Sequence, residues 1–180
     1  MTDAKGKPAV FLDRDGTLNI ERTYLCDPDK LELFPDVFES LTRLRDHGFL
    51  LFVVTNQSGI GRGYYTEEDM HRVNRRLEEV LAPEGISFEQ IYFAPESPEQ
   101  DSAGRKPSPK FLLDAARDFG VDLANSYMVG DKMSDLRCGW NAGVRRSILV
   151  RTGYGGETFE KHEADIADAV VVENLSAATD

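Results

Sequence analysis

Short apolar runs alternate along the chain with segments in which apolar residues recur every three or four positions. Residues 9–12 (AVFL) and 49–54 (FLLFVV) are continuously apolar, which is typical of parallel strands that are covered on both faces. Between them, residues 37–44 have their apolar side chains at helical spacing, and Gly48 follows at a position typical of helix ends. This first part of the chain therefore predicts a strand, a helix and a second strand.

The same alternation continues to the end of the chain. Thr66 precedes three acidic residues, a pattern that predicts the start of a helix with an apolar stripe reaching Leu81. Ser108 and Pro109 predict a cap and a first helical turn, in a helix that ends at Gly120. Further strands are predicted at residues 90–93, 127–129, 147–150 and 169–172, the last at an edge. Alternating strands and helices indicate a parallel sheet in a three-layer α/β fold.

Length and composition indicate one domain, residues 1–180, with a substantial core. No apolar run approaches the roughly 20 residues that span a bilayer, and the first residues lack the pattern of a signal peptide, so we expect a cytoplasmic protein. The 21 basic and 32 acidic residues give a net charge of −11, which opposes binding to nucleic acid or anionic membranes. Cys26 and Cys138 belong to no cysteine or histidine cluster, and we expect free thiols.

Polar side chains follow the predicted strands at the points where those strands end. They lie at residues 13–17, 55–59 and 130–135, and Arg105 and Lys106 close the loop after the third strand. Ligands of parallel α/β sheets bind beyond the carboxyl ends of the strands. The sequence therefore predicts that carboxylates, a hydroxyl and a lysine gather at one edge of the sheet.

Three clustered carboxylates repel one another and need a cation, and a set of oxygen ligands suits Mg²⁺. A hydroxyl, backbone amides and a lysine opposite the metal suit a phosphoryl group. The histidines, His47, His71 and His162, lie outside these loops. The nucleophile and the general acid are therefore predicted to be carboxylates.

Four motifs in order resemble the haloacid dehalogenase superfamily of aspartate-nucleophile phosphatases. They are DRDGT at residue 13, TNQSG at residue 55, a lysine before a proline-led helix, and GDKMSD followed by NAG. The resemblance covers nearly the whole chain and implies a Rossmann-like, haloacid dehalogenase-like sheet with helices on both faces. Residues 18–36 leave no room for a large cap domain before the first helix, so we expect an open, capless site.

The resemblance also implies the roles of the motif residues. Asp13 would attack phosphorus, and Asp15 would protonate the leaving oxygen and then deprotonate water. Thr55, with the backbone amide of Asn56, would hold the phosphoryl oxygens, and Lys106 would stabilise the nucleophile and the transferring group.

The same resemblance implies a magnesium site and a substrate-binding set. Asp131 would bind Mg²⁺ together with Asp13 and the carbonyl of Asp15. Asp135 would orient metal-bound water or Lys106, although from its position alone it could also cap or start the following helix.

Four residues beside the motifs form the expected substrate-binding set: Asn56, Gln57, Arg62 and Arg105. Either arginine could bind a second phosphate or be an ordinary surface charge. Tyr64 and Tyr65 are interpreted as packing residues rather than as a platform for substrate.

The phrase TNQSGIGRGYYTEEDM resembles three capless groups: heptose-bisphosphate phosphatases, histidinol-phosphate phosphatases, and the phosphatase domain of polynucleotide kinase-phosphatases. GDKMSD, RKPSP and LVRTGYG are most similar to the heptose-bisphosphate group. The first two groups usually carry a zinc loop, but its four ligand positions here are Ala94, Glu96, Ser102 and Gly104. We therefore expect Mg²⁺ and no structural zinc.

The expected partner is a small phosphorylated metabolite, bound by a monomer, with no nucleic acid or membrane. The leading hypothesis is a phosphatase for a sugar phosphate such as D-glycero-D-manno-heptose 1,7-bisphosphate, and histidinol phosphate is the alternative. A polynucleotide 3′-phosphatase conflicts with the acidic charge. A receiver-like phosphoacceptor has its aspartate after the third strand, whereas Asp13 follows the first and has a second aspartate two positions later.

Overall fold

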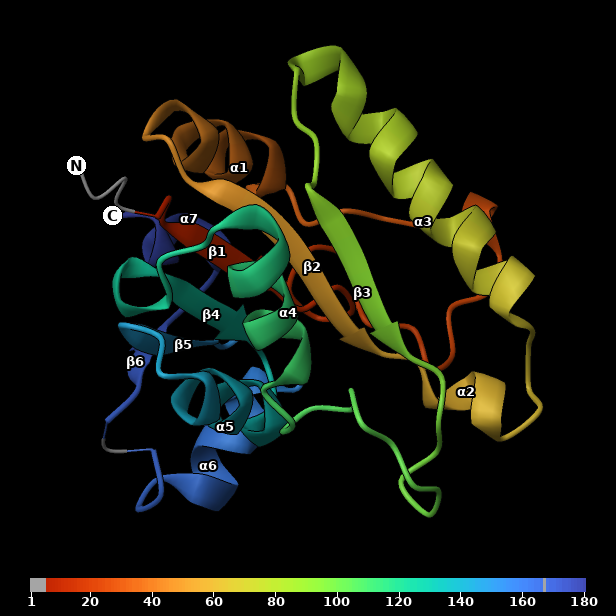
Figure 1. Ribbon diagram of the computed structural model, residues 1–180. Coiled ribbons are helices and arrows are strands. Elements are labelled where there is room, and N and C mark those ends of the chain that lie inside the picture. The colour runs from red at the N-terminus through yellow and green to blue at the C-terminus, as the bar shows by residue number, and fades with distance from the viewer. Residues whose placement is uncertain (1–5, 167) are drawn as a thin grey trace.

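The computed structural model describes residues 6–166 and 168–180. Residues 1–5, which belong to the segment predicted not to be a signal peptide, lie outside the described residues. Six parallel strands form one sheet in the order β3-β2-β1-β4-β5-β6 (Figure 1). Their bounds are β1 (Ala9–Leu12), β2 (Leu50–Asn56), β3 (Gln90–Ala94), β4 (Tyr127–Gly130), β5 (Arg146–Val150) and β6 (Val170–Val172).

Helices connect the strands along the chain. The α-helices are α1 (Val37–Asp46), α2 (Ser58–Gly61), α3 (Glu67–Leu81), α4 (Lys110–Phe119), α5 (Met133–Ala142), α6 (Gly155–His162) and α7 (Leu175–Ala178). Short 3₁₀ helices are η1 (Pro28–Lys30), η2 (Ala82–Glu84) and η3 (Leu123–Asn125). The six-stranded parallel sheet confirms the predicted fold class, with β6 at an edge.

Predicted boundaries differ from the structure by one or two residues. Strand β2 continues two residues beyond the apolar run, because Thr55 and Asn56 pair with β3. Helix α4 begins at Lys110 rather than at Pro109, and the Ser108 hydroxyl accepts a hydrogen bond from the amide of Lys110 at 3.3 Å. The short helix α2, directly after β2, has no periodic apolar signal in the sequence and was not predicted.

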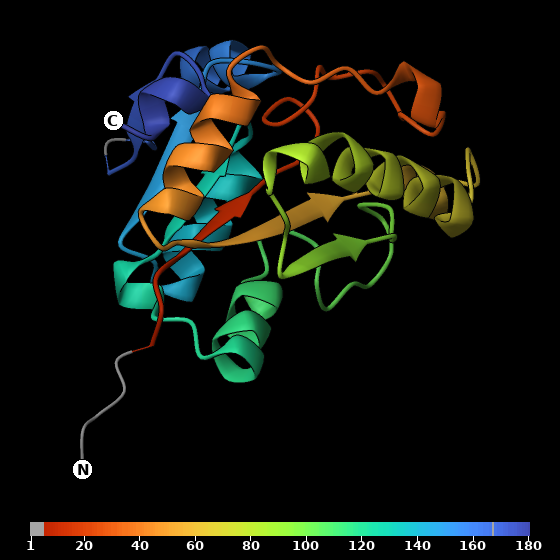
Figure 2. The same cartoon turned by 90° about the horizontal axis from the view of Figure 1, so that it is seen from above.

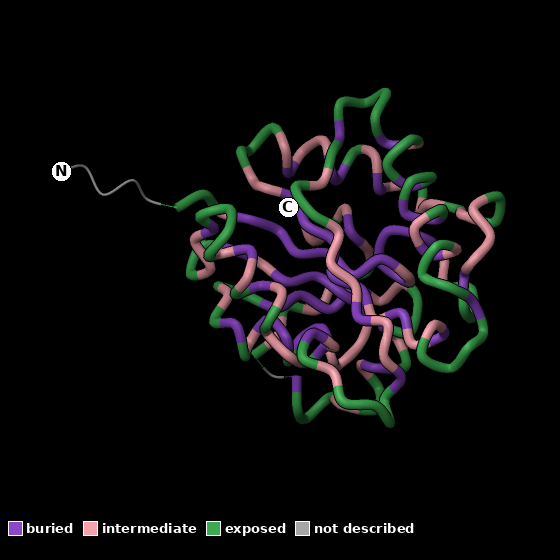
Figure 3. The backbone as a smooth tube through the Cα atoms, turned by 45° about the vertical axis from the view of Figure 1, so that its right-hand side comes forward, coloured by how far each residue is buried: buried purple, intermediate pink, exposed green. Residues whose placement is uncertain are grey.

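Apolar side chains pack on both faces of the sheet. Helices α1, α3 and α7 cover one face, where Leu41, Leu77 and Leu175 belong to one buried cluster with residues of β1 and β2. Helices α4 and α5 cover the other face, around Phe11 and Phe52. Figure 2 shows this layering from above, and Figure 3 shows buried residues following the central strands. The three layers agree with the continuously apolar strands of the sequence.

The strand order places β1 between β2 and β4. The chain leaves β1 for β2 and β3 on one side, then returns across the sheet to β4, so the order reverses between β1 and β4. At such a switch point the loops after two neighbouring strands diverge and leave a crevice. Asp13 and Asp131, the residues that follow β1 and β4, stand at this crevice.

Helix α3 packs on the same face of the sheet as α1 and α7. Its start has a capping box, in which Thr66 and Asp69 each accept a hydrogen bond from the other's backbone amide. Its inner stripe, from Met70 to Leu81, is buried as predicted. Within that apolar stripe lies one polar residue, Asn74, with 5 % of its surface exposed.

Candidate active site

A pocket of about 320 Å³ opens beyond the carboxyl ends of the strands. Seven residues expected from the sequence line it: Asp13, Asp15, Thr55, Asn56, Gln57, Lys106 and Asp135. The pocket is also lined by residues to which the sequence assigned no role: Glu21, Arg22, Tyr24, Lys132 and Tyr154. The structure therefore brings together residues from every loop in which the sequence predicted chemistry.

Lys106 lies between two carboxylates. Its Nζ is 2.7 Å from Asp13 Oδ1 and 2.6 Å from Asp135 Oδ1, and it donates a hydrogen bond to the carbonyl of Val54 at 2.6 Å. Burial alone would lower the pKa of Lys106, but the charges of Asp13 and Asp135 raise it above its usual value. The ammonium group therefore remains charged beside Asp13, although it is almost completely buried.

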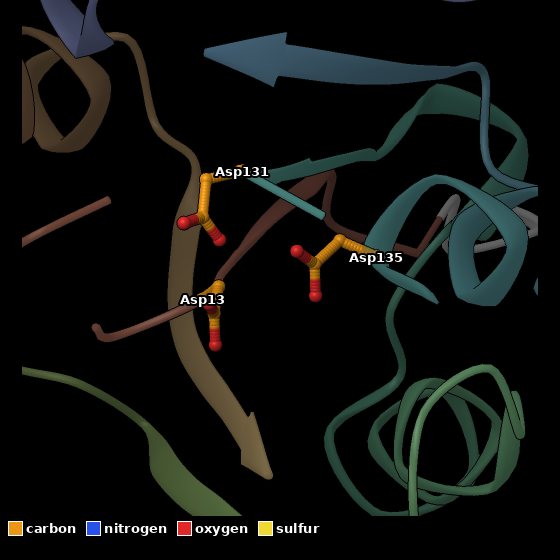
Figure 4. Close-up of side chains that lie close together, drawn as sticks. All are labelled: Asp13, Asp131 and Asp135. Carbon is orange, nitrogen blue, oxygen red and sulfur yellow. The ribbon is translucent and has the colours of Figure 1, made fainter. Parts of the chain in front are cut away.

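The side chains of Asp13, Asp131 and Asp135 lie close together (Figure 4). One oxygen from each lies within 4.8 Å of the others, and all three residues are buried. Burial and the charges of Asp13 and Asp135 raise the pKa of Asp131 to about 8. This acidic cluster therefore lacks enough positive charge of its own, even with Lys106 present.

The carboxylate oxygens of Asp131 indicate that a cation supplies the missing positive charge. Asp131 Oδ2 accepts a hydrogen bond from the amide of Tyr154 at 2.8 Å. Its buried Oδ1 has no hydrogen-bond partner among residues 6–166 and 168–180. A buried, unpartnered carboxylate oxygen next to a second carboxylate fits a cation with oxygen ligands, such as Mg²⁺. The Oδ1 atom of Asp135 differs from that of Asp131, because it is in direct contact with the ammonium group of Lys106.

Glycines allow the backbone to approach these carboxylates. A Cβ atom on Gly16 or on Gly153 would collide with Asp131 Oδ2, and one on Gly130 would collide with the carboxyl group of Asp135. Gly16 also has a φ of +89°, a conformation that residues with a Cβ rarely adopt. The position of Asp131 thus depends on glycine in two separate loops.

Asp15 is held by hydrogen bonds on both oxygens. Arg14 Nη2 lies 2.9 Å from Oδ2, Asn19 Nδ2 donates to Oδ1 at 3.0 Å, and Gln57 Nε2 donates to Oδ2 at 2.9 Å. Burial acts to raise the pKa of Asp15, but the charge of Arg14 and these hydrogen bonds hold it below its usual value. The carboxylate is therefore ionised and fixed in direction before substrate arrives.

The side chains of Asn56 and Gln57, expected to bind substrate, make contacts within the protein. Asn56 Oδ1 accepts from the amide of Lys106 at 2.9 Å, and Asn56 Nδ2 donates to the Lys106 carbonyl at 3.2 Å. Gln57 Nε2 donates to Thr55 Oγ1 at 2.8 Å as well as to Asp15. These two side chains thus orient Lys106, Thr55 and Asp15.

Neither Arg62 nor Arg105 is among the residues that line this pocket. Arg62 Nη2 lies 3.3 Å from Glu99 Oε1, and Arg105 Nη1 donates to the carbonyl of Glu96 at 3.0 Å. Partial burial and the nearby charge of Arg62 lower the pKa of Arg105. The two arginines are thus neighbours, on the side of the pocket formed by α2 and the loop after β3.

Two other cations line the pocket itself. Lys132 belongs to the GDKMSD motif and lies 3.5 Å from Glu21 and over the ring of Tyr154. Its position inside a recognised motif could have marked it in the sequence. Arg22, which pairs with Glu32 at 2.7 Å, lies in the loop between β1 and η1, where neither periodicity nor a motif marks it.

The four positions compared with a zinc loop carry no cysteine or histidine. Ser102 Oγ donates to Glu96 Oε2 at 2.7 Å, and Gly104 packs against the ring of Phe111. A direct hydrogen bond therefore joins two of these positions. Cys26 and Cys138 are free thiols, as predicted.

Among the described residues, no helix has both the length and the apolar character needed to cross a bilayer.

Comparison with known proteins identifies the family. Residues 103–178 match the HAD-hydrolase-like family model. Two proteins named D-glycero-beta-D-manno-heptose-1,7-bisphosphate 7-phosphatase are 40 % identical to the chain. The one from Pasteurella multocida aligns over 153 residues, 82 % of this chain and 83 % of its own length. The one from Escherichia coli K12 aligns over 157 residues, with coverages of 83 % and 82 %.

A solved structure leads to the same group. The D,D-heptose 1,7-bisphosphate phosphatase of B. bronchiseptica, crystallised with magnesium and phosphate, matches this fold with a TM-score of 0.88. It is 31 % identical, and the alignment covers 96 % of each chain. The chain thus belongs to the heptose-bisphosphate phosphatase family of the haloacid dehalogenase superfamily, and it is a phosphatase.

Proposed function

We propose that this phosphatase hydrolyses the 7-phosphate of D-glycero-β-D-manno-heptose 1,7-bisphosphate through an aspartyl-phosphate at Asp13. The observation that carries the proposal is the position of Asp13, between the ammonium group of Lys106 and a carboxylate cluster with an unpartnered oxygen. The substrate is that of the two bacterial relatives that are 40 % identical over four fifths of this chain.

Asp131 and Asp13, with the backbone carbonyl of Asp15, would hold Mg²⁺. The donor set supports this assignment, because it consists of oxygen atoms and includes the unpartnered Asp131 Oδ1. The ion would offset the repulsion between the clustered carboxylates and a phosphate dianion. Asp135 fits the second of its two expected roles, because it contacts Lys106 directly.

The protein side chains account for each bond change. A carboxylate oxygen of Asp13 attacks phosphorus and the phosphate ester bond breaks. Asp15 donates its proton to the departing alkoxide, which is a poor leaving group without it. Water then attacks the aspartyl-phosphate, Asp15 accepts the proton of that water, and the P–O bond to Asp13 breaks to release inorganic phosphate.

Asp15 must carry a proton for the first of these steps. In the structure Arg14 lowers the pKa of Asp15. A phosphate dianion bound next to this carboxylate acts in the opposite direction, because a nearby negative charge favours the neutral acid. Substrate binding itself would therefore prepare Asp15 as the acid.

Thr55 and the amide of Asn56 would hold the phosphoryl oxygens. Thr55 Oγ1 accepts a hydrogen bond from Gln57, so its own proton is available for a phosphoryl oxygen. Lys106 would balance the charge that develops on the transferring group. Its contact with Asp135 fixes the ammonium group in place.

Arg62 and Arg105 would bind the remote phosphate at the 1-position. They are neighbours beside the pocket, and Arg105 directly precedes Lys106 in sequence. Glu99, the partner of Arg62, has 68 % of its side-chain surface exposed. Such an exposed ion pair contributes little free energy, so a phosphate can replace it.

The remaining expectations are part of the same proposal: one domain over residues 1–180, Mg²⁺ without structural zinc, a monomer, and a cytoplasmic location. The single sheet with a core on both faces supports the single domain, and the absence of cysteine and histidine at the zinc-loop positions supports a site without structural zinc.

The test is turnover by the purified protein with Mg²⁺ on heptose 1,7-bisphosphate, histidinol phosphate and a 3′-phosphorylated oligonucleotide. We expect the bisphosphate to have the highest kcat/KM and Asp13→Asn to abolish its hydrolysis. A preference for histidinol phosphate would show that the assignment of the heptose bisphosphate as substrate is wrong. If Asp13→Asn retains substantial activity, with deamidation excluded, the assignment of Asp13 as the nucleophile is wrong.

A further inference from the structure

The hydrogen bonds on Asp15 come from side chains that are themselves buried and held by others. Arg14 is completely buried and Gln57 is 3 % exposed, so both are largely shielded from solvent. Arg14 contacts both oxygens of the Asp15 carboxylate, and Gln57 contacts one of them. Whatever fixes Arg14 and Gln57 therefore fixes the direction of the Asp15 carboxylate.

Asn74 fixes Arg14. Its Oδ1 accepts a hydrogen bond from Arg14 Nη1 at 2.8 Å, and this is the one contact of the guanidinium group with helix α3 among the hydrogen bonds of the described residues. Asn74 lies in the apolar stripe of α3, where a buried amide is unfavourable unless it is paired. Asn74 is therefore buried like a core residue, and its side chain makes a polar contact with Arg14.

Tyr65 fixes Gln57. The Tyr65 hydroxyl donates to Gln57 Oε1 at 2.6 Å, and Gln57 Nε2 donates to Asp15 and to Thr55 Oγ1. A carboxamide has an accepting end and a donating end. With its accepting end engaged by the Tyr65 hydroxyl, Gln57 turns its two N–H donors to Asp15 and Thr55.

We propose that Asn74 and Tyr65 are positioning residues that hold the acid Asp15 in its working direction, Asn74 through Arg14 and Tyr65 through Gln57. The proposal rests on the proposed role of Asp15 as acid and base. An aspartate side chain has three staggered χ1 positions, and donors on both oxygens select one of them. Asn74 acts from outside the pocket, since it is not among the residues that line it.

The test compares two substrates with the variant Asn74→Leu, which keeps the number and branching of the side-chain heavy atoms and suits the apolar stripe. One substrate is the sugar bisphosphate, whose leaving alkoxide needs a proton, and the other is p-nitrophenyl phosphate, whose leaving group does not. We expect kcat to fall about tenfold on the sugar and by a clearly smaller factor on p-nitrophenyl phosphate, which needs Asp15 only as the base in hydrolysis of the aspartyl-phosphate, with KM nearly unchanged on both. Tyr65→Phe, which removes one oxygen atom, should show the same selective loss if Asn74→Leu does not fold.

Two further variants separate positioning from a general loss of structure. Asn74→Asp retains an acceptor oxygen for Arg14 and should keep most of the sugar activity. Leu77→Met changes the same stripe one turn away and should leave the ratio of the two activities unchanged. Equal losses on both substrates for Asn74→Leu and Tyr65→Phe, or a selective loss in Leu77→Met, would overturn the proposal.

Asp15→Asn shows whether the proposed function itself holds. If Asp15→Asn is selectively slow on the sugar and Asn74→Leu and Tyr65→Phe are not, the positioning proposal is wrong and the role of Asp15 stands. If Asp15→Asn loses both activities equally, the acid role is wrong, and the positioning proposal is rejected with it.

Discussion

Replacing Asp131 with asparagine should stabilise the metal-free protein while it abolishes metal binding. Asp131 is completely buried, one of its oxygens is unpartnered, and its pKa is raised to about 8 by burial and by the charges of Asp13 and Asp135. Asparagine has nearly the same shape and no charge. Its carbonyl oxygen can still accept from the amide of Tyr154, and its amide group can donate to Asp13.

The size of the stabilisation expected for Asp131→Asn follows from the raised pKa of Asp131. A carboxyl group whose pKa is raised on folding stabilises the protein below its unfolded-state pKa, and this contribution is lost as the pH rises through the folded-state pKa. A rise of the pKa from the usual 3.8 to about 8 means that the ionised Asp131 destabilises the wild type by at most about 5 kcal/mol near pH 8, at about 1.4 kcal/mol per pKa unit. At pH 5 the same reasoning gives a destabilisation of the wild type of less than about 2 kcal/mol, because Asp131 is then mostly protonated in the folded protein.

The assay is thermal unfolding of the wild type and Asp131→Asn, in EDTA and in Mg²⁺, at pH 5 and pH 8. In EDTA at pH 8 we expect the variant to unfold at a higher temperature, by about 5–15 °C, since each kcal/mol shifts the Tm of a chain of this size by about 2–4 °C. At pH 5 this difference should shrink. Mg²⁺ should raise the Tm of the wild type at pH 8 and leave the variant unchanged.

Two results would refute this reasoning. If Asp131→Asn unfolds below the wild type in EDTA at pH 8, the buried charge of Asp131 is compensated in a way that the hydrogen bonds do not reveal. If Mg²⁺ stabilises the variant as much as the wild type, the ion binds elsewhere. Asp165→Asn, a change at an exposed carboxylate on the surface, serves as the matched control and should behave as the wild type in all four conditions.

Three other changes test the remaining features of the site. Lys106→Met should lower kcat by at least about a hundredfold and destabilise the fold by about 3–5 kcal/mol, because it leaves Asp13 and Asp135 buried without their cation; turnover and urea unfolding measure the two effects. A kcat close to that of the wild type would contradict the role of Lys106. Arg105→Ala should lower kcat/KM about ten- to a hundredfold on the bisphosphate, through loss of one charge-assisted contact of about 1.5–3 kcal/mol, but hardly on p-nitrophenyl phosphate. Equal losses on both substrates would instead assign it to the scaffold. Gly153→Ala should weaken the response of activity to Mg²⁺, because its methyl group would displace Asp131; titration of activity with the ion checks this, and an unchanged midpoint would argue against it.

The sequence by itself determined the elements and the place of the chemistry. The continuous apolar runs marked β1 and β2 because a strand buried on both faces needs apolar residues at successive positions. The polar motifs that follow the runs predicted a common site, since the carboxyl ends of parallel strands meet at one edge of a sheet. Asp13, Lys106 and Asp135 do meet there, although 93 residues separate Lys106 from Asp13.

The tertiary structure alone decided which polar atoms meet. The sequence named Arg62 and Arg105 for the substrate but gave no role to Arg22 and Lys132, which line the pocket. It also gave no role to Asn74, whose position in the stripe of α3 indicates core packing. Periodicity reports which face of an element is buried, and it carries no information about the neighbour on that face. The contact between Arg14 and Asn74 joins residues 60 positions apart and exists because the fold packs α3 against the end of β1.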